Sequence, residues 1–434
     1  MADIQAAPMS KEVTFSIHTL GCKVNQYEGE RIAADLGTFG WKRADFSSRA
    51  DVYIVNSCTV TAVANHKSRQ LIRRALRNNP DATVVVTGCY ADSAREEIAS
   101  IEGVSLVLGN EDKDKLSHLL AERAGGPGMS AITKDAPAQT FHSRPLVKVQ
   151  DGCNQFCSYC IVPHVRGDLW SRPEAEIVGE VRRLADAGTQ EIVLTGIHLG
   201  LYGAGEKTDL GDLLAKLAEI PGLGRIRLSS IELREVTPKI VELISTSGKI
   251  CNHLHIPLQS GSDGILSRMN RHYTAGEFIE RTDELKHRVA DIAITTDVIV
   301  GFPGETDEDF EDSVRLIERV GFSKLHVFKF SPRKGTPAAD YDRQVPMEVK
   351  DKRSATLISI GEKLSSQFAS SYIGKELGVL IERRQGEYLS GVSDNYIRVL
   401  CEGSDKNIGT LATVTITGQE NAVLYGRIRR SVNR

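Results

Sequence analysis

The chain has 434 residues, of which 41% are hydrophobic and 26% charged, and its formal net charge is −3 at pH 7. This length predicts two or three domains, and the composition is typical of a soluble globular protein. The weak net charge excludes a globally basic nucleic-acid binder, so such a partner would have to meet a local patch. Residues 1–10 do not resemble a signal peptide and no apolar run is long enough to cross a bilayer, which predicts a cytoplasmic protein without membrane contact.

The first part of the chain, residues 11–124, alternates predicted strands with predicted helices. Strands are expected at residues 13–18, 51–56, 83–87 and 104–108. Helices are expected from about Glu28, over about 62–78, and from an N-cap at Asn110 to about Ala124. This alternation predicts an α/β domain with a parallel sheet and crossover helices.

Three cysteines, Cys22, Cys58 and Cys89, each follow one of these strands. Ligands of open α/β sheets bind outside the carboxyl ends of the strands, so the three thiols should converge on one edge of the sheet. Each could be an ordinary buried thiol, since free cysteine is among the most buried residue types. Three in the same structural position favour a cluster site with three thiolates.

Residues 125–140 contain the turn-forming run Gly-Gly-Pro-Gly and are predicted to be a linker. A second series of βα units follows, with a helix that begins at Pro173 and ends near Gly188. Strands are expected at residues 146–150, 191–195, 225–230, 253–258, 292–300 and 324–330. Six such units predict an open, partial (β/α)6 barrel, whose active site would lie at the C-terminal ends of its strands.

The loop after the first of these strands holds Cys153, Cys157 and Cys160 at C-x3-C-x2-C spacing, with Tyr159 directly before the third. Thiolates hold iron–sulfur clusters, and four ligands are the rule. A loop that supplies three would leave one iron of a [4Fe–4S] cluster for an amino acid that chelates through its amine and carboxylate, as S-adenosylmethionine (SAM) does. Zinc is the alternative, because His164 could be a fourth ligand, but zinc sites usually have paired ligand spacings.

A polar helix over about residues 346–371 is expected to lead out of the barrel, which places that domain at 141–371. The remaining residues, 372–434, carry short strands between Gly, Asn and Asp turns. These strands are expected at residues 377–381, 396–401, 411–417 and 423–428. The pattern predicts a small β-barrel, a fold that commonly binds nucleic acid, with a structural or dimerising role as the alternative.

Several segments carry a family resemblance. They are TLGCKVNQYE at 19–28, NSCTVT at 56–61, TGC at 87–89, the cysteine loop at 150–167, LTGIHLG at 194–200, HIPLQSGS at 255–262 and VGFPGET at 300–306. Over nearly its whole length the chain resembles the methylthiotransferase family of radical-SAM enzymes. The resemblance implies an N-terminal methylthiotransferase domain, a radical-SAM barrel and a C-terminal TRAM domain.

The resemblance also implies the cofactors, which are SAM and two [4Fe–4S] clusters. The cluster on Cys153, Cys157 and Cys160 would bind and cleave SAM, and the cluster on Cys22, Cys58 and Cys89 would hold the sulfur to be transferred. An electron donor such as a flavodoxin or ferredoxin is implied as a partner, while the sulfur source stays open.

Four further residues are candidates for binding SAM. By the resemblance, Tyr159 lies near its adenine, and Thr195 and Gly196 lie near its methionine end. Gln259 is a polar candidate at the same edge of the barrel, and residues 297–305 are candidates to line the adenosine. The alternatives are a plain βα turn for Thr195 and Gly196, surface turn chemistry for Gln259, and a role in shaping the loop alone for residues 297–305.

The family has three branches, which modify isopentenyladenosine in tRNA, threonylcarbamoyladenosine (t6A) in tRNA, or an aspartate of a ribosomal protein. The segment from Gly21 to Glu28 is similar to the t6A branch, and it lacks the Gln-Met-Asn run and the Asp-Ser pair that the isopentenyladenosine branch has at this place. The substrate is therefore expected to be t6A in tRNA, at the adenosine 3′ of the anticodon.

Two basic segments are candidates to contact tRNA. Arg69, Arg73 and Arg77 share one helix face, which could track phosphates or could simply be solvated. Arg427, Arg429 and Arg430 form the second candidate patch. A rival of a different class is a non-catalytic iron–sulfur protein that binds RNA, but such a protein would be expected to ligate each cluster with four cysteines.

Overall fold

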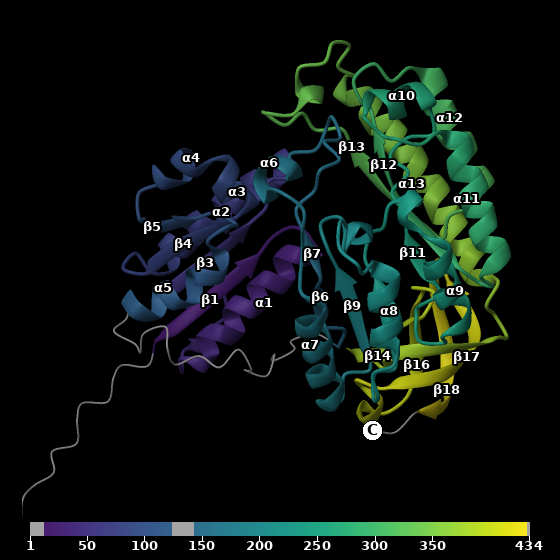
Figure 1. Cartoon of the computed structure of the whole chain (residues 1–434), viewed down its shortest axis with the longest axis horizontal. Coiled ribbons are helices and arrows are strands. Elements are labelled where there is room, and N and C mark those ends of the chain that lie inside the picture. Colours follow the sequence, from purple (N-terminus) through teal and green to yellow (C-terminus); the bar gives the residue numbers. More distant parts are fainter. Residues whose placement is uncertain (1–12, 124–142, 432–434) are drawn as a thin grey trace, which may run out of the picture. The chain divides into compact units, whose positions relative to one another are not determined.

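The computed structural model describes residues 13–123 and 143–431, which belong to two compact units (Figure 1). The predicted linker, 125–140, lies outside the described residues. Within those residues, no helix is both long and apolar enough to span a membrane.

The N-terminal unit is built on a parallel sheet of five strands in the order β2-β1-β3-β4-β5. The strands are β1 (Thr14–Thr19), β2 (Lys42–Arg43), β3 (Val52–Ser57), β4 (Thr83–Gly88) and β5 (Val104–Leu108). The four predicted strands are confirmed to within two residues. Strand β2 is not predicted from the sequence, because two exposed basic residues at the sheet edge carry no apolar pattern.

Helices cover both faces of this sheet. They are α1 (Lys23–Thr38), α2 (Ala62–Asn78), α3 (Cys89–Ser93), α4 (Arg95–Ala99) and α5 (Leu116–Arg123). Apolar residues of α1 and α5 pack on one face, and those of α2, α3 and α4 pack on the other. Both faces are therefore buried, which explains the nearly continuous apolar runs of β3 and β4.

Two helix starts differ from the sequence prediction. Helix α1 begins directly after Cys22, which is its N-cap in an extended conformation, and not near Glu28. Asn110 is not an N-cap, because α5 begins only at Leu116 after a short 3-10 helix. The Asn110 side chain instead donates a hydrogen bond to the carboxylate of Asp92 at 2.6 Å.

The larger unit contains six parallel strands in two three-stranded sheets, with the orders β10-β9-β6 and β11-β12-β13. These strands are β6 (Leu146–Lys148), β9 (Glu191–Thr195), β10 (Arg225–Leu228), β11 (His253–His255), β12 (Ala293–Val300) and β13 (Lys324–Lys329). Isolated bridges between Ile226 and Ile250 and between Ser230 and His255 join the two sheets. A short antiparallel pair, β7 (Gln150–Asp151) with β8 (Trp170–Ser171), flanks the cysteine loop.

Helices alternate with these strands and, apart from the short helix after the cysteine loop, pack on one face of the sheets (Figure 1). They are α6 (Val162–Arg166), α7 (Glu174–Asp186), α8 (Leu210–Ala218), α9 (Pro238–Thr246), α10 (Asp263–Arg268), α11 (Ala275–Arg288), α12 (Asp307–Val320) and α13 (Met347–Ser370). Pro173 is the N-cap of α7 and not its first residue.

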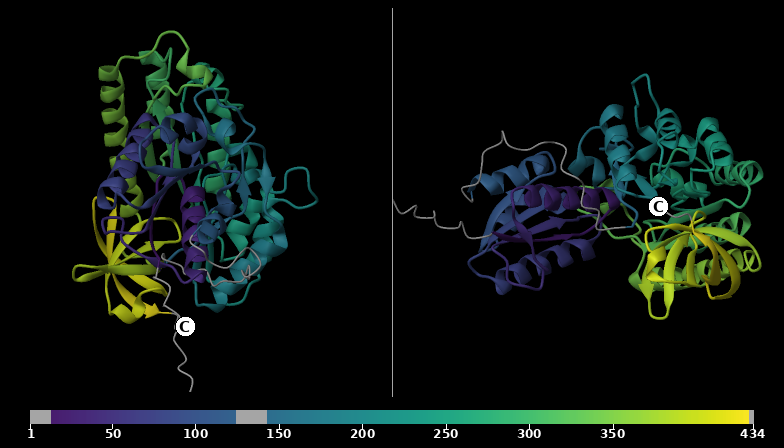
Figure 2. Two further views of the ribbon diagram at one scale, coloured as in Figure 1. Left: turned by 90° about the vertical axis from the view of Figure 1, so that its left-hand side faces the viewer. Right: turned by 90° about the horizontal axis from the view of Figure 1, so that it is seen from below.

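The C-terminal strands close into a small barrel in the order β14-β15-β16-β18-β17 (yellow in Figure 2). They are β14 (Glu376–Gln385), β15 (Tyr388–Ser393), β16 (Arg398–Glu402), β17 (Leu411–Glu420) and β18 (Val423–Ser431). The barrel has one strand more than the sequence predicts. Strand β15 was missed because Gly391 interrupts its apolar pattern, yet a Cβ there would overlap the backbone oxygen of Leu380.

A buried charge network fastens this barrel to the parallel strands. Glu191, at the start of β9, pairs with Arg225 and Arg227 of β10. Arg225 donates to the carbonyl oxygens of Gly378 and Val392 at 3.0 and 2.7 Å. Arg227 donates in the same way to the carbonyls of residues 393 and 394, at 2.9 and 2.8 Å. The C-terminal barrel is therefore attached at the N-terminal ends of β9 and β10.

Candidate metal centres

Cys22, Cys58 and Cys89 follow β1, β3 and β4, which are adjacent parallel strands. The sequence prediction that these cysteines share one edge of the sheet is therefore confirmed. Gly21, with φ near +101°, brings the chain beside Cys58, because a Cβ on Gly21 would lie 2.9 Å from the Cys58 sulfur. The residue at position 21 must therefore be glycine, because a side chain there would prevent this close approach.

Buried polar groups hold the loops that carry these cysteines. Asn25 donates to the carbonyl oxygens of Leu20 and Ser57 at 2.9 Å each, and it ties the ends of β1 and β3 together. Lys113 is 3% exposed and pairs with Glu28 at 2.5 Å. Its ammonium also donates to the Asn25 side chain at 3.3 Å, so a fixed polar layer supports the cysteine edge.

The second cysteine group lies in the loop after β7, whose backbone is fixed from several directions. Gly152 has φ near +74°, and a Cβ there would overlap the carbonyl of Asp168. Ser158 accepts from the backbone N–H of Ala338 at 2.8 Å and donates from its own N–H to Met269 at 3.0 Å. The loop is thus held by segments more than 100 residues away in sequence.

The three thiols of this loop lie in one partly closed environment. Burial, with a smaller contribution from the neighbouring Cys157 and Cys153, raises the pKa of Cys160 to about 12. Burial also raises the pKa of Cys157. Three adjacent thiolates are therefore unfavourable unless a cation compensates them, and iron in a cluster would supply that charge.

A buried arginine faces one of these thiols. The Nη1 atom of Arg271 lies 3.5 Å from Cys157 Sγ and 3.1 Å from Glu232 Oε1. The Arg271 side chain is only 3% exposed, so its charge acts at low dielectric on both partners. Arg271 and Glu232 are not predicted from the sequence, because neither lies in a motif with the cysteines.

A histidine and a carboxylate face a second thiol. The Nδ1 atom of His198 lies 3.5 Å from Cys153 Sγ, and its Nε2 pairs with Glu235. Burial lowers the pKa of His198, but hydrogen bonds with Cys153 and Glu235 outweigh it and raise that pKa to about 10. A Cβ on Gly200 would overlap the Glu235 carboxylate, so glycine is needed there. His198 lies within the LTGIHLG segment at 194–200, and this family-like segment is the feature of the sequence that could have identified it.

The structure places three of the four predicted SAM-binding residues next to the cysteine loop or the strand that leads into it. Tyr159 is half-buried and packs against an apolar group that includes Phe302 and Phe330. Thr195 O accepts from the N–H of Val149, and a Cβ on Gly196 would lie about 3 Å from Gln150.

The fourth predicted residue, Gln259, follows β11 and has a left-handed backbone with φ near +66°. Its N–H donates to the carbonyl of Asp297 at 2.8 Å, which joins it to β12. In the part of the chain that the structure describes, its buried Oε1 has no hydrogen-bond partner. A non-glycine residue held in this conformation with an unused acceptor fits a ligand-binding role better than a surface turn.

An open pocket of about 350 Å³ lies beside Cys157. Its lining consists of Phe156, Cys157, His164, Gly335, Thr336, Pro337 and Asp340. His164, the fourth ligand of the zinc alternative, packs edge-on against Phe156 with ring centroids 5.9 Å apart. The pocket gives a small molecule access to the cysteine loop.

The two basic segments are only partly available to a partner. Arg69 donates to Tyr90 and to Glu97, at 2.7 and 3.1 Å, so it serves the N-terminal unit internally. Arg73 and Arg77 are exposed on the same helix. Arg427 and Arg429 are exposed on β18, and the Arg430 side chain lies outside the described residues.

Two family models match the chain. The radical SAM superfamily matches residues 147–317, and the uncharacterized protein family UPF0004 matches residues 14–109. Among solved structures, the radical S-adenosylmethionine methyltransferase TsrM from Kitasatospora setae superposes with a TM-score of 0.56 at 16% identity. The match covers 76% of this chain and 74% of TsrM, and it shows a shared fold.

Curated relatives match over nearly the whole chain. The threonylcarbamoyladenosine tRNA methylthiotransferase MtaB of Bacillus subtilis is 44% identical over 93% of both chains. The protein of the same name from Chlamydia pneumoniae is 38% identical over 93% of this chain and 94% of its own. The tRNA-2-methylthio-N(6)-dimethylallyladenosine synthase of Lachnoclostridium phytofermentans is 33% identical over 95% of this chain and 94% of its own.

Proposed function

Since this chain belongs to the methylthiotransferase family of radical-SAM enzymes, we propose that it acts on N6-threonylcarbamoyladenosine in tRNA. It replaces the C2 hydrogen of this base, at the adenosine 3′ of the anticodon, with a methylthio group. One observation carries the choice of substrate. Relatives named for threonylcarbamoyladenosine are 36–44% identical, whereas those named for dimethylallyladenosine are 33–34% identical.

The three predicted domains serve this function. Residues 11–124 form the methylthiotransferase domain, residues 141–371 form an open, partial (β/α)6 radical-SAM barrel, and residues 372–434 form a TRAM barrel. The six parallel strands joined by bridges support the second assignment. The closed order of the last five strands supports the third.

The cysteine groups would hold two [4Fe–4S] clusters. Cys153, Cys157 and Cys160 fit a cluster that also binds SAM, because they share one loop and burial raises the pKa of Cys157 and Cys160, whose thiolates therefore need a compensating cation. Cys22, Cys58 and Cys89 fit a second cluster, since they share the edge of three adjacent strands. When bound, these groups would supply one-electron cleavage of SAM and the sulfur for transfer.

The surrounding residues position and shield these groups. Arg271 and His198 place positive charge beside Cys157 and Cys153, which favours the thiolate forms that bind iron. Tyr159 and its apolar neighbours keep water away on one side of the loop. Thr195, Gly196 and Gln259 offer the polar groups and close backbone approach that SAM would need.

The partners follow from the reaction. The tRNA substrate presents its base in an unpaired loop, from which a protein can splay it out without opening a duplex. The exposed Arg73 and Arg77 are candidates to contact phosphates. A flavodoxin or ferredoxin would supply the electron, and the reaction would take place in the cytoplasm.

The deciding experiment expresses the chain in a host that lacks its own methylthiotransferases. Mass spectrometry of digested tRNA should then show the methylthio form of t6A and unmodified isopentenyladenosine. The variant Cys157→Ala is the matched control and should show neither product. A methylthio-isopentenyladenosine peak without methylthio-t6A would reject the substrate, and the absence of SAM-dependent changes in the EPR spectrum of the reduced protein would favour the non-catalytic alternative.

A further inference from the structure

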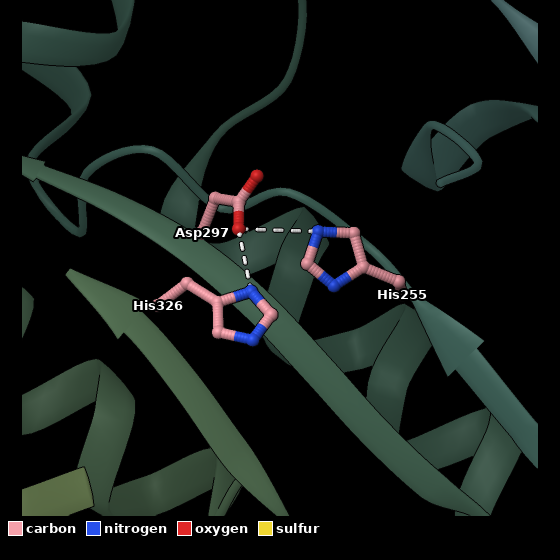
Figure 3. Close-up of side chains that lie close together, drawn as sticks. All are labelled: His255, Asp297 and His326. Atoms are coloured by element: carbon pink, nitrogen blue, oxygen red, sulfur yellow. Dashed lines mark hydrogen bonds and ion pairs between the residues drawn. The ribbon is translucent and has the colours of Figure 1, made fainter. Parts of the chain in front are cut away.

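Three side chains from adjacent parallel strands of the larger unit meet at one point (Figure 3). They are His255 at the end of β11, Asp297 in β12 and His326 in β13. Asp297 Oδ1 lies 3.2 Å from His255 Nε2 and 3.1 Å from His326 Nδ1. One nitrogen or oxygen from each of the three lies within 4.8 Å of the others.

These separations suit a shared metal ion. A divalent ion bound at about 2.0–2.2 Å to nitrogen and oxygen holds neighbouring ligand atoms about 3–3.5 Å apart. Two histidines and one carboxylate are the ligand set of many iron and zinc sites with open positions. The ring planes of His255 and His326 are inclined by 28° with centroids 5.4 Å apart, and both rings present a nitrogen to the same carboxylate oxygen.

A further hydrogen bond orients one of the two histidines. The Nδ1 atom of His255 lies 2.9 Å from Thr295 Oγ1, which leaves Nε2 directed at Asp297. Metal-binding histidines usually have such an outer partner on the second ring nitrogen, because it fixes the ring and its tautomer. Although burial works against it, hydrogen bonding to both histidines holds the pKa of Asp297 well below its usual range.

The site also has room for further ligands. The side chain of His255 is 11% exposed, that of Asp297 is 26% exposed and that of His326 is 38% exposed. Asp297 lies on the strand face opposite to Ile294 and Val298, which pack in the main core of the larger unit. The three ligands therefore face the side of the sheet that the core does not fill.

We propose that His255, Asp297 and His326 bind one divalent transition-metal ion of the Zn²⁺ or Fe²⁺ class, distinct from the two cysteine sites. The remaining coordination positions would take oxygen ligands from water or from a bound molecule. A carboxylate that merely joins two histidines by hydrogen bonds is the competing explanation. The two differ in a measurable quantity, the metal content of the protein.

The test uses full-length protein in which both cysteine sites have been loaded with iron and sulfide under anaerobic conditions. Equilibrium dialysis against Zn²⁺, followed by elemental analysis, should find about one zinc per chain in addition to unchanged iron. The variants Asp297→Asn and His326→Gln should each lose this zinc and keep their iron. The exposed His272 gives the matched control, because His272→Gln should bind zinc like the unaltered protein.

Thermal unfolding provides a second measurement. Zn²⁺ should raise the unfolding midpoint of the unaltered protein and of His272→Gln, but not of Asp297→Asn, because an ion that binds the folded state stabilises it. Far-UV circular dichroism establishes that each variant is folded. The metal site is rejected if folded Asp297→Asn binds as much zinc as the unaltered protein does.

Discussion

Replacing Glu191 with Gln should weaken the attachment of the C-terminal barrel more than any change at an exposed ion pair. The Glu191 side chain is fully buried and faces the guanidinium groups of Arg225 and Arg227, with Arg144 3.9 Å away. Glutamine keeps the shape but removes the charge, which leaves two buried cations without their carboxylate. The loss of one partner from a buried pair typically costs about 3–5 kcal/mol.

The lower end of that range applies here. Arg225 and Arg227 keep their hydrogen bonds to four backbone carbonyls of the C-terminal barrel, so part of their hydrogen-bonding capacity stays satisfied. We therefore expect Glu191→Gln to lower the free energy of unfolding of the larger unit by about 3 kcal/mol. The larger unit spans residues 140–434, so its unfolding entropy is about 0.6 kcal/mol/K, and that loss corresponds to a fall of roughly 5 °C in the unfolding midpoint.

Urea and thermal unfolding followed by circular dichroism would measure the effect. The matched control is Glu277→Gln, which removes an exposed partner of Arg234 and should change the unfolding free energy by at most about 1 kcal/mol. Equal effects of the two substitutions would refute the argument, because they would mean that the buried network contributes no more than a surface pair. An unchanged midpoint in Glu191→Gln would refute it as well.

Three further predictions follow from the domain and cysteine assignments. Replacing Cys153, Cys157 and Cys160 together with Ala should abolish SAM cleavage and leave the iron of the N-terminal unit, so an iron-free protein in elemental analysis would contradict separate sites. Cys89→Ala should still form 5′-deoxyadenosine but not methylthio-t6A in an activity assay with chromatographic detection, and loss of both products in folded protein would count against this division. Removing residues 372–434 should lower the affinity for tRNA, and unchanged affinity in a binding titration would favour a structural role for the barrel. The truncated chain should also unfold at a lower temperature, because the truncation uncovers Arg225 and Arg227.

The sequence predicted the alternation of strands and helices well, because strands such as β3, β4 and β9 are buried on both faces and therefore carry apolar runs. The errors occur where that signal is weak. Strand β2 is only two residues long, and strand β15 contains Gly391, which is needed for close packing against β14. The start of α5 was misplaced because Asn110, a good N-cap by type, bonds to Asp92 instead.

The cysteine groups could be predicted because their signals are local. Cys153, Cys157 and Cys160 share one loop, and each N-terminal cysteine follows its own strand. The polar groups that face the loop cysteines could not be predicted in the same way, since parallel strands bring together residues that lie far apart in the chain. Arg271 contacts a thiol 114 residues away, and His198 contacts one 45 residues away. Asp297 meets its two histidines only through strand pairing.

Removing the charge of Arg271 and removing the charge of Glu232 should shift the reduction potential of a cluster on Cys157 in opposite directions. Arg271 lies between Cys157 and Glu232, so the carboxylate offsets part of the positive charge that the sulfur experiences. The reduction potential of an iron–sulfur cluster depends on net charge and on hydrogen bonds to its sulfur atoms. If Cys157 binds iron, Arg271→Gln should lower the potential, because it removes a cation that favours the reduced form. Glu232→Gln should raise it, because the guanidinium charge is then no longer offset. An EPR-monitored redox titration would measure both shifts, and shifts of the same sign in two folded variants with full iron content would show that Arg271 does not act on the cluster through its charge.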